Sequence, residues 1–135
     1  MPRRLTDKIA LITGAGGGQG RAAAIMFARE GANVVVVDIK VEGGEETVQL
    51  VEKVGGSAVF QKADVSKADH MQGAVDRACE AYGGLHIMYN NAAVLHKNDT
   101  TVTNLEEDMW DFVIDVNLKS AFLVARHAIP EMKNQ

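Results

Sequence analysis

Apolar residues along the chain gather in short continuous runs that are separated by amphipathic stretches. The runs predict four strands, over residues 9–12, 34–37, 58–62 and 85–89. A short, unbroken apolar run is typical of a strand that is covered on both faces of a sheet. Helical spacing of apolar residues between the runs predicts helices over residues 20–30, 43–54 and 66–82, and each is followed by glycine.

Two features of the remaining pattern complete the predicted order of elements. Ser66, with Asp69 three positions later, resembles a helix-capping arrangement, although that motif prefers Glu or Gln at the second position. A polar loop opens at Asn90 and runs to Asn104, and a long helix follows over about residues 105–133, with a kink expected at Pro130. This helix is apolar on more than one side, which predicts that it packs against a partner.

The alternation of strands and helices predicts the fold class. Strand–helix–strand units imply parallel strands that are joined by right-handed crossovers. We therefore expect a doubly wound α/β fold with a parallel, Rossmann-like sheet of about four strands and four helices. At 135 residues, the chain is long enough for one dinucleotide-binding domain over residues 1–135, but too short for a separate substrate domain.

A glycine-rich turn joins the first predicted strand to the first predicted helix. It reads Thr13-Gly14-Ala15-Gly16-Gly17-Gly18-Gln19-Gly20, and the next strand ends at Asp38. Glycine allows backbone amides to approach a pyrophosphate without an intervening Cβ: Gly14 permits the tight turn, Gly18 the approach to the cofactor, and Gly20 close helix packing. Strand, glycine turn, helix and strand-end acid together indicate a dinucleotide-binding unit.

Asp38 also bears on the choice of cofactor. A carboxylate at this position can accept hydrogen bonds from both hydroxyls of the adenosine ribose, and it would repel a 2′-phosphate. Lys40 argues in the opposite direction, but the residue before Gly18 is Gly17 and not a basic residue. These residues favour NAD over NADP, while the alternative that Asp38 only caps a turn stays open.

Composition and charge remove several classes of function. A net charge of -4 provides no basic face for nucleic acid. No apolar stretch approaches membrane-spanning length, and residues 6–8 interrupt any signal sequence, so we expect a cytoplasmic protein without membrane contact. The only cysteine, Cys79, fits a reducing compartment. The four histidines lie far apart without ligand spacing, so no metal site is predicted.

The motifs together resemble the classical short-chain dehydrogenases/reductases over essentially the whole chain. The turn Thr13-Gly14-x-x-x-Gly18-x-Gly20 matches that family's cofactor signature, Asp64 the acid that touches the adenine, and Asn90-Asn91-Ala92 the stabilising motif after the fourth strand. Asn117 matches the asparagine of the catalytic tetrad. The resemblance implies one catalytic residue, Asn117, and cofactor contacts at Thr13, Gly14, Gly18, Gln19, Gly20, Asp38, Asp64, Val65, Asn91 and Ala92.

The chain departs from the family's pattern in three ways. Ala93 replaces the usual glycine and Gln19 the usual aliphatic residue, which leaves the backbone contacts to phosphate intact. The family's serine on a fifth strand and its tyrosine four residues before a lysine are absent: Tyr82 is followed four places later by His86, and Tyr89 by Ala93. A phenol acts as acid/base near neutral pH only when a nearby cation lowers its pKa. We therefore expect cofactor binding without turnover from this truncated chain.

The resemblance implies an NAD-dependent oxidoreductase that transfers a hydride between NAD and a small alcohol or carbonyl compound. The alternative is a non-catalytic module that binds NAD or a partner subunit, and it is supported by the missing serine, tyrosine and lysine together with the apolar final helix. A methyltransferase dependent on S-adenosylmethionine would also use glycines and a strand-two acid, but it explains neither the Asn90-Asn91-Ala92 motif nor Asn117. A fourth strand left at the sheet edge and the apolar final helix predict a homo-oligomer.

Overall fold

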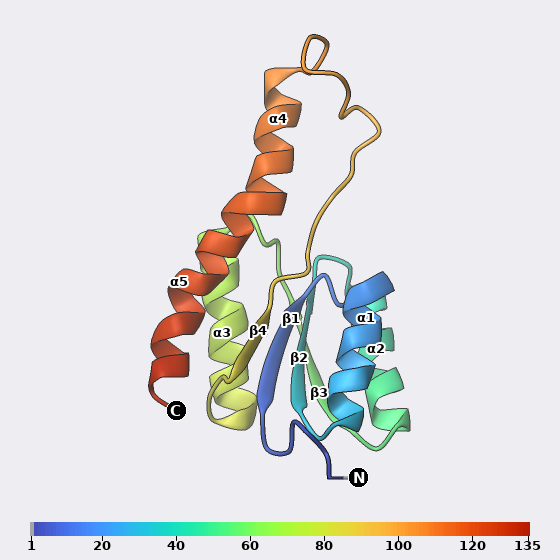
Figure 1. Cartoon of the computed structure of the whole chain (residues 1–135), viewed down its shortest axis with the longest axis vertical. Coiled ribbons are helices and arrows are strands. Elements are labelled where there is room, and N and C mark those ends of the chain that lie inside the picture. The colour runs from blue at the N-terminus through green and yellow to red at the C-terminus, as the bar shows by residue number, and fades with distance from the viewer. Residues whose placement is uncertain (1) are drawn as a thin grey trace.

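The computed structural model describes residues 2–135 and follows the predicted alternation of strands and helices (Figure 1). The strands are β1 (Ile9–Thr13), β2 (Asn33–Asp38), β3 (Ser57–Lys62) and β4 (Ile87–Tyr89). The helical elements are α1 (Gly18–Arg29), α2 (Val41–Lys53), α3 (Ala68–Tyr82), α4 (Glu107–Ile114), the π-helical segment η1 (Asp115–Lys119) and α5 (Ser120–Lys133). The last three follow one another without interruption, so they correspond to the single long helix that was predicted.

The four strands form one parallel sheet in the order β3-β2-β1-β4. Ile12 pairs with Val36 on one side and with Tyr89 on the other, so β1 lies inside the sheet. Helices α1 and α2 cover one face, and α3 and α5 cover the other (Figure 1). The predicted doubly wound α/β fold is confirmed. The strand β4 pairs only with β1 within the described residues and lies at an edge, as expected.

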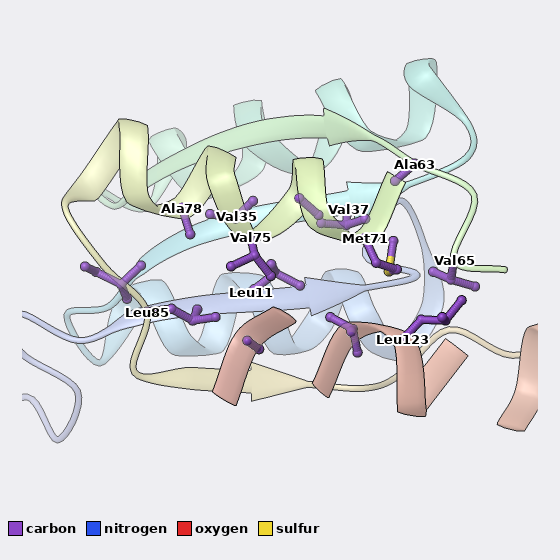
Figure 2. Packing of buried hydrophobic residues seen from close by; sticks show 14 residues of the cluster. Leu11, Val35, Val37, Ala63, Val65, Met71, Val75, Ala78, Leu85 and Leu123 are labelled. Atoms are coloured by element: carbon purple, nitrogen blue, oxygen red, sulfur yellow. The ribbon is translucent and has the colours of Figure 1, made fainter. Parts of the chain in front are cut away.

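Buried apolar side chains form two clusters, one on each face of the sheet. On β2, Val35 and Val37 point to the cluster beneath α3 and α5, which Figure 2 shows with Leu11, Met71 and Leu123. The alternate residues of β2, at 34 and 36, belong to the cluster beneath α1 and α2. Successive side chains of a strand point to opposite faces, so a continuous valine run fills both clusters.

One prediction about local structure needs correction. Ser66 does not cap α3, because the residue that precedes this helix is Lys67 and no side chain caps the helix. The Ser66 hydroxyl instead donates to Asp64 Oδ1 at 2.7 Å. The Ser66 hydroxyl is thus used in a local bond to the carboxylate that follows β3 and is not available as a helix cap. Helix α5 continues through Pro130 to Lys133, so this proline does not end the helix, and the kink expected there stays a prediction.

Helix α4 and the loop before it extend beyond the sheet, whereas α5 packs beside α3 (Figure 1). Leu118, Phe122 and Ile129 are between 53% and 63% exposed, so more than half of each side chain faces solvent. Their spacing of four and seven residues places them on one side of the helix. Within residues 2–135, no helix is both long and apolar enough to cross a membrane.

Candidate functional site

The carboxyl ends of the four strands open into one cleft of about 650 Å³. Its position follows from the strand order. From β1, the chain continues to β2 and β3 on one side of the sheet and then returns to place β4 on the other side of β1. The loops after β1 and β4 therefore diverge and leave a crevice between them. The cleft is lined by Gly14, Gly16, Gly17, Gln19, Asp38, Ile39, Lys40, Ala63, Asp64, Val65, Asn91, Ala92, Ala93, Val94, Phe112 and Val116.

Two glycines allow the turn after β1 to close tightly. Gly14 has a φ of 64°, a left-handed conformation that favours glycine, and a Cβ on it would lie 2.9 Å from the Cα of Ala92. Gly20 faces the start of the turn, where a Cβ would overlap the Gly14 carbonyl oxygen. The first turn of α1 therefore packs directly on the end of β1 because residue 20 has no side chain.

The first turn of α1 presents backbone amides that have no protein acceptor. Within residues 2–135, the N–H groups of Gly17, Gly18 and Gln19 donate to no other group, whereas Arg21 N–H donates to the Gly17 carbonyl at 3.0 Å. Gly17 and Gln19 line the cleft. Unpaired amides at the positive end of a helix dipole can hold a phosphate or carboxylate group.

Asp38 ends β2 beside the glycine turn, and two backbone amides fix its carboxylate. Gly16 N–H donates to Oδ2 at 2.9 Å, and Lys40 N–H donates to Oδ1 at 2.9 Å. A carboxylate has about four lone-pair sites, so each oxygen keeps the capacity for one further hydrogen bond. Asp38 can therefore accept from two hydroxyl groups of a ligand in the cleft.

The loop after β4 is attached to the end of β1 through Thr13 and Asn91. The buried Thr13 hydroxyl accepts hydrogen bonds from the N–H groups of Asn91 at 3.1 Å and Ala92 at 3.0 Å. Asn91 Nδ2 in turn lies 3.1 Å from the Thr13 carbonyl oxygen and 3.3 Å from that of Gly14. These bonds fix the loop after β4 to the end of β1 beneath the cleft. The polar side chains of Thr13 and Asn91 are needed at these strand ends because they form these bonds.

Asp64 lines the cleft where the chain leaves β3. Its Oδ1 accepts from both the N–H and the hydroxyl of Ser66, at 2.9 Å and 2.7 Å. Burial opposes ionisation of this carboxyl group, but the hydrogen bonds from Ser66 and the nearby charges of Lys67 and His70 outweigh it and lower the pKa of Asp64. The site thus holds two carboxylates that neighbouring donors orient, through both oxygens of Asp38 and through Oδ1 of Asp64.

Asn117 lies in η1, where its side chain pairs with the backbone of a single residue in the opposite loop. Its Oδ1 accepts from Val94 N–H at 2.7 Å, and its Nδ2 donates to the Val94 carbonyl at 2.9 Å. π-Helical turns inside longer helices frequently mark functional sites. Asn117 therefore attaches the cleft-lining Val94 to the helix, and it lies outside the set of residues that line the cleft.

The structure brings most of the predicted site residues together. The cleft is lined by seven of the ten predicted cofactor contacts, namely Gly14, Gln19, Asp38, Asp64, Val65, Asn91 and Ala92. Thr13 and Gly20 are buried beneath it, and Gly18 begins α1 beside it. Sequence reasoning missed the role of Gly16 and the contributions of Phe112 and Val116, which reach the cleft from the long helix. Across residues 2–135, no group of three or more His, Cys, Asp and Glu residues could hold a metal ion.

Fold and cleft together define a Rossmann-like α/β domain. A family model described as short chain dehydrogenase matches residues 8–135. Cyclohexanol dehydrogenase of Acinetobacter sp. (strain SE19) is 37% identical over 130 residues, and 3beta-hydroxysteroid dehydrogenase of Mediterraneibacter gnavus is 42% identical over 130 residues. Each alignment covers 96% of this chain, but 51% and 47% of the respective relative.

Solved structures agree with the sequence comparison. The crystal structure of levodione reductase matches with a TM-score of 0.93 and 31% sequence identity, over 98% of this chain and 52% of that one. The chain belongs to the short-chain dehydrogenase family. It spans about half the length of the curated relatives it matches. Members of this family bind a nicotinamide cofactor, NAD or NADP.

Proposed function

We propose that this chain is the cofactor-binding part of an NAD-dependent oxidoreductase that acts on a small alcohol or carbonyl compound. The observation that carries the proposal is the juxtaposition of unpaired amides at the start of α1 with the oriented Asp38 carboxylate across one cleft. The names of relatives, among them a cyclohexanol dehydrogenase, support a hydroxyl or carbonyl substrate.

The residues present fit a dinucleotide. The amides of Gly17, Gly18 and Gln19 would hold the pyrophosphate, while the free lone pairs of Asp38 would accept from the two ribose hydroxyls. The bound nicotinamide supplies or accepts the hydride. A cofactor carrying a 2′-phosphate would place a second negative charge beside Asp38, so the site favours NAD over NADP.

We propose that residues 1–135 bind the cofactor without catalysing its turnover. Proton transfer at the substrate oxygen needs an acid/base group within hydrogen-bond reach. Among the described residues, neither tyrosine lines the cleft: the Tyr82 hydroxyl lies 3.0 Å from that of Ser57, and the Tyr89 ring stacks on Phe27 with 6.2 Å between centroids. Asn117 matches a tetrad residue by family resemblance, and its relay role stays a prediction.

The test is a titration of the purified chain with NADH and NADPH, followed by the fluorescence of the reduced nicotinamide. We expect saturable binding of NADH and weaker binding of NADPH. Asp38→Asn removes the negative charge at constant size, so it should weaken NADH binding by about tenfold and narrow the difference between the two cofactors, because hydrogen bonds to charged groups are the stronger ones.

Asp99→Asn is the matched control, because Asp99 is exposed in the loop before α4 and lies outside the cleft. Absence of NADH binding up to millimolar concentration would refute the proposal. Equal affinity for both cofactors in the parent protein would refute the NAD preference alone. During incubation with NAD and small secondary alcohols, we expect no rise in the absorbance of reduced nicotinamide, because the chain does not catalyse hydride transfer.

A non-catalytic module that binds NAD or a second subunit is the alternative function, and the absence of a cleft-lining tyrosine among residues 2–135 favours it. Reading the coding frame beyond Gln135 separates the two functions. A Tyr-x-x-x-Lys motif shortly downstream supports the oxidoreductase, whereas a stop codon supports the module. We also propose that the chain forms a homo-oligomer through the exposed apolar side of η1 and α5, where a symmetric contact would bury Leu118, Phe122 and Ile129.

A further inference from the structure

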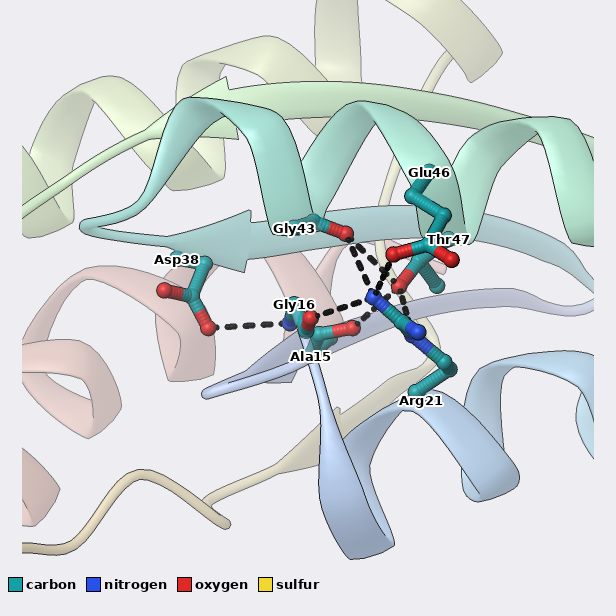
Figure 3. A network of polar contacts seen from close by, with 7 residues as sticks. All are labelled: Ala15, Gly16, Arg21, Asp38, Gly43, Glu46 and Thr47. Atoms are coloured by element: carbon teal, nitrogen blue, oxygen red, sulfur yellow. Dashed lines mark hydrogen bonds and ion pairs between the residues drawn. The ribbon is translucent and has the colours of Figure 1, made fainter.

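Gly16 is held from two sides by groups that come from different elements (Figure 3). Its N–H donates to Asp38 Oδ2 at 2.9 Å, and its carbonyl oxygen accepts from Arg21 Nη2 at 2.7 Å. Arg21 belongs to the first turn of α1, and Asp38 ends β2. The peptide groups of Gly16 thus connect a guanidinium group to the carboxylate that faces the cleft.

Arg21 is itself fixed by the first turns of α2. Its Nη2 also lies 3.2 Å from the Gly43 carbonyl oxygen and 2.7 Å from Glu46 Oε2, so the two N–H groups of Nη2 are shared among three acceptors. Its Nε donates to Thr47 Oγ1 at 3.0 Å (Figure 3). The Arg21 side chain is 24% exposed, so these bonds are partly shielded from water. A planar guanidinium group with several fixed donors is suited to holding several oxygens at once.

Thr47 closes the network on the buried side. Its hydroxyl is fully buried and lies 2.8 Å from the Ala15 carbonyl oxygen and 3.0 Å from that of Gly43. The single hydroxyl proton is donated to one of these acceptors, while the oxygen accepts from Arg21. Helix α2 is therefore attached to the glycine turn at two successive residues, 15 and 16.

The network has little room for adjustment. A Cβ on Gly16 would lie 2.8 Å from the Cγ of Asp38, and a Cβ on Gly43 would overlap the Gly16 carbonyl oxygen. Gly16 is thus packed directly against the Asp38 side chain and against the backbone of α2. A displacement of Gly16 must change the surroundings of the Asp38 carboxylate, because its N–H supplies one of the two hydrogen bonds that orient this group.

We propose that Arg21 is a positioning residue that sets cofactor preference by fixing Gly16, and through it the Asp38 carboxylate. This inference rests on the proposed NAD preference. A carboxylate held on both oxygens presents its remaining lone pairs to a ribose diol and cannot rotate away from a 2′-phosphate. If Gly16 is released, Asp38 gains rotational freedom, so the diol loses an oriented acceptor and the phosphate meets a weaker repulsion.

The experiment compares the parent chain with Arg21→Met, Arg21→Lys and Arg29→Met, each titrated with NADH and NADPH in the same preparation. Met keeps the length of the aliphatic stem but donates no hydrogen bond. We expect Arg21→Met to weaken NADH binding by about tenfold and NADPH binding by clearly less, in line with loss of a charge-assisted hydrogen bond. Arg21→Lys should recover part of the NADH/NADPH preference, because one ammonium group can still reach a carbonyl oxygen.

Arg29→Met is the matched control, since Arg29 is exposed in the last turn of the same helix and should leave both affinities unchanged. The ratio of the two dissociation constants does not depend on the fraction of folded protein, so partial unfolding of a variant cannot imitate the effect. Thr47→Val, which removes the hydroxyl that accepts from Arg21 Nε, should shift the ratio in the same direction.

Two outcomes separate this inference from the proposed function. If the parent prefers NADH and Arg21→Met weakens both cofactors by the same factor, Arg21 has only a structural role and the inference is wrong, while the proposed NAD preference stands. If the parent itself shows no preference, the proposed function fails at that point, and the inference fails with it.

Discussion

Single residues in this cleft act mainly through the backbone groups they hold. Thr13 and Asn91 join two loops, and Asp38 receives two amide donors. The side chains of Thr13, Asp38 and Asn91 all bind backbone groups, so a substitution at these positions changes the shape of the loops as well as the chemistry of one group. Asp64 offers the clearest case, because its ionisation is linked to the fold.

Asp64 makes stability depend on acid pH. Its pKa is lowered in the folded chain, so its stabilising effect is complete above the ordinary pKa of an unfolded aspartate, about 4, and is lost as the pH falls through the lower folded value. We expect Asp64→Asn to reduce the loss of unfolding free energy between about pH 5 and pH 2. Urea unfolding of cofactor-free protein at several pH values measures this dependence.

Ser66→Ala provides a second variant for the same test. It removes the hydroxyl bond to Asp64 Oδ1 and keeps the N–H bond, so its pH dependence should fall between those of the parent and Asp64→Asn. If the free energy of unfolding falls as steeply at acid pH in both variants as in the parent, this account of Asp64 is wrong.

The residues that could be predicted from the sequence are those whose role depends on local geometry. The left-handed turn at Gly14 and the acid that follows the valine run at Asp38 are both visible in the order of residues. Gly16 was missed because its role depends on how closely the turn approaches β2, although its place inside the glycine run was a signal. Phe112 lies nearly one hundred residues after Gly16 in the chain, and no periodicity indicates that it faces the cleft.

At the scale of elements, the start of α1 makes a tightly constrained contact with the end of β1. Gly20 packs against the end of β1 with no space for a methyl group, whereas Gly73, inside α3, has no atom within 4 Å of an added Cβ. Both glycines are helical, so they share the same intrinsic cost of about 1 kcal/mol relative to alanine. They differ only in their surroundings.

We therefore expect opposite effects from the same substitution. Gly20→Ala should destabilise the chain by about 1–3 kcal/mol and weaken cofactor binding, because overpacking displaces the turn. Gly73→Ala should stabilise the chain by about 0.5–1 kcal/mol and leave binding unchanged. Urea unfolding and NADH titration of both variants measure these changes, and equal effects would show that helix propensity alone decides the outcome.

The long helix formed by α4, η1 and α5 could be predicted only in part from the periodicity of its apolar residues. Its apolar character on more than one side was visible in the sequence, and its outer side is exposed in the structure at Leu118, Phe122 and Ile129. The π-helical segment within it was not predicted, because the extra residue is accommodated by a contact between Asn117 and Val94, far apart in the sequence. The helix propensity of the residues in this segment gives no information about such a contact.

At the scale of the whole molecule, the proposed self-association can be tested on that exposed side. Phe122 is 59% exposed, and Phe122→Glu places a charge at the centre of the contact between copies. We expect the sedimentation coefficient to fall to that of a smaller species. Val102→Glu is the control, because Val102 is 87% exposed in the loop before α4 and away from α5. A parent chain that sediments as a monomer at all concentrations would contradict the proposal.

The valine run of β2 couples the unfolding of the two faces of the sheet. Its neighbouring residues, such as Val35 and Val36, support opposite layers of helices. When the helices on one face detach, β2 loses the packing on that face. The helices on the other face then lose a rigid strand to pack against. We therefore expect no half-folded species with α1 and α2 in place and α3 and α5 released, and the molecule should melt in a single step.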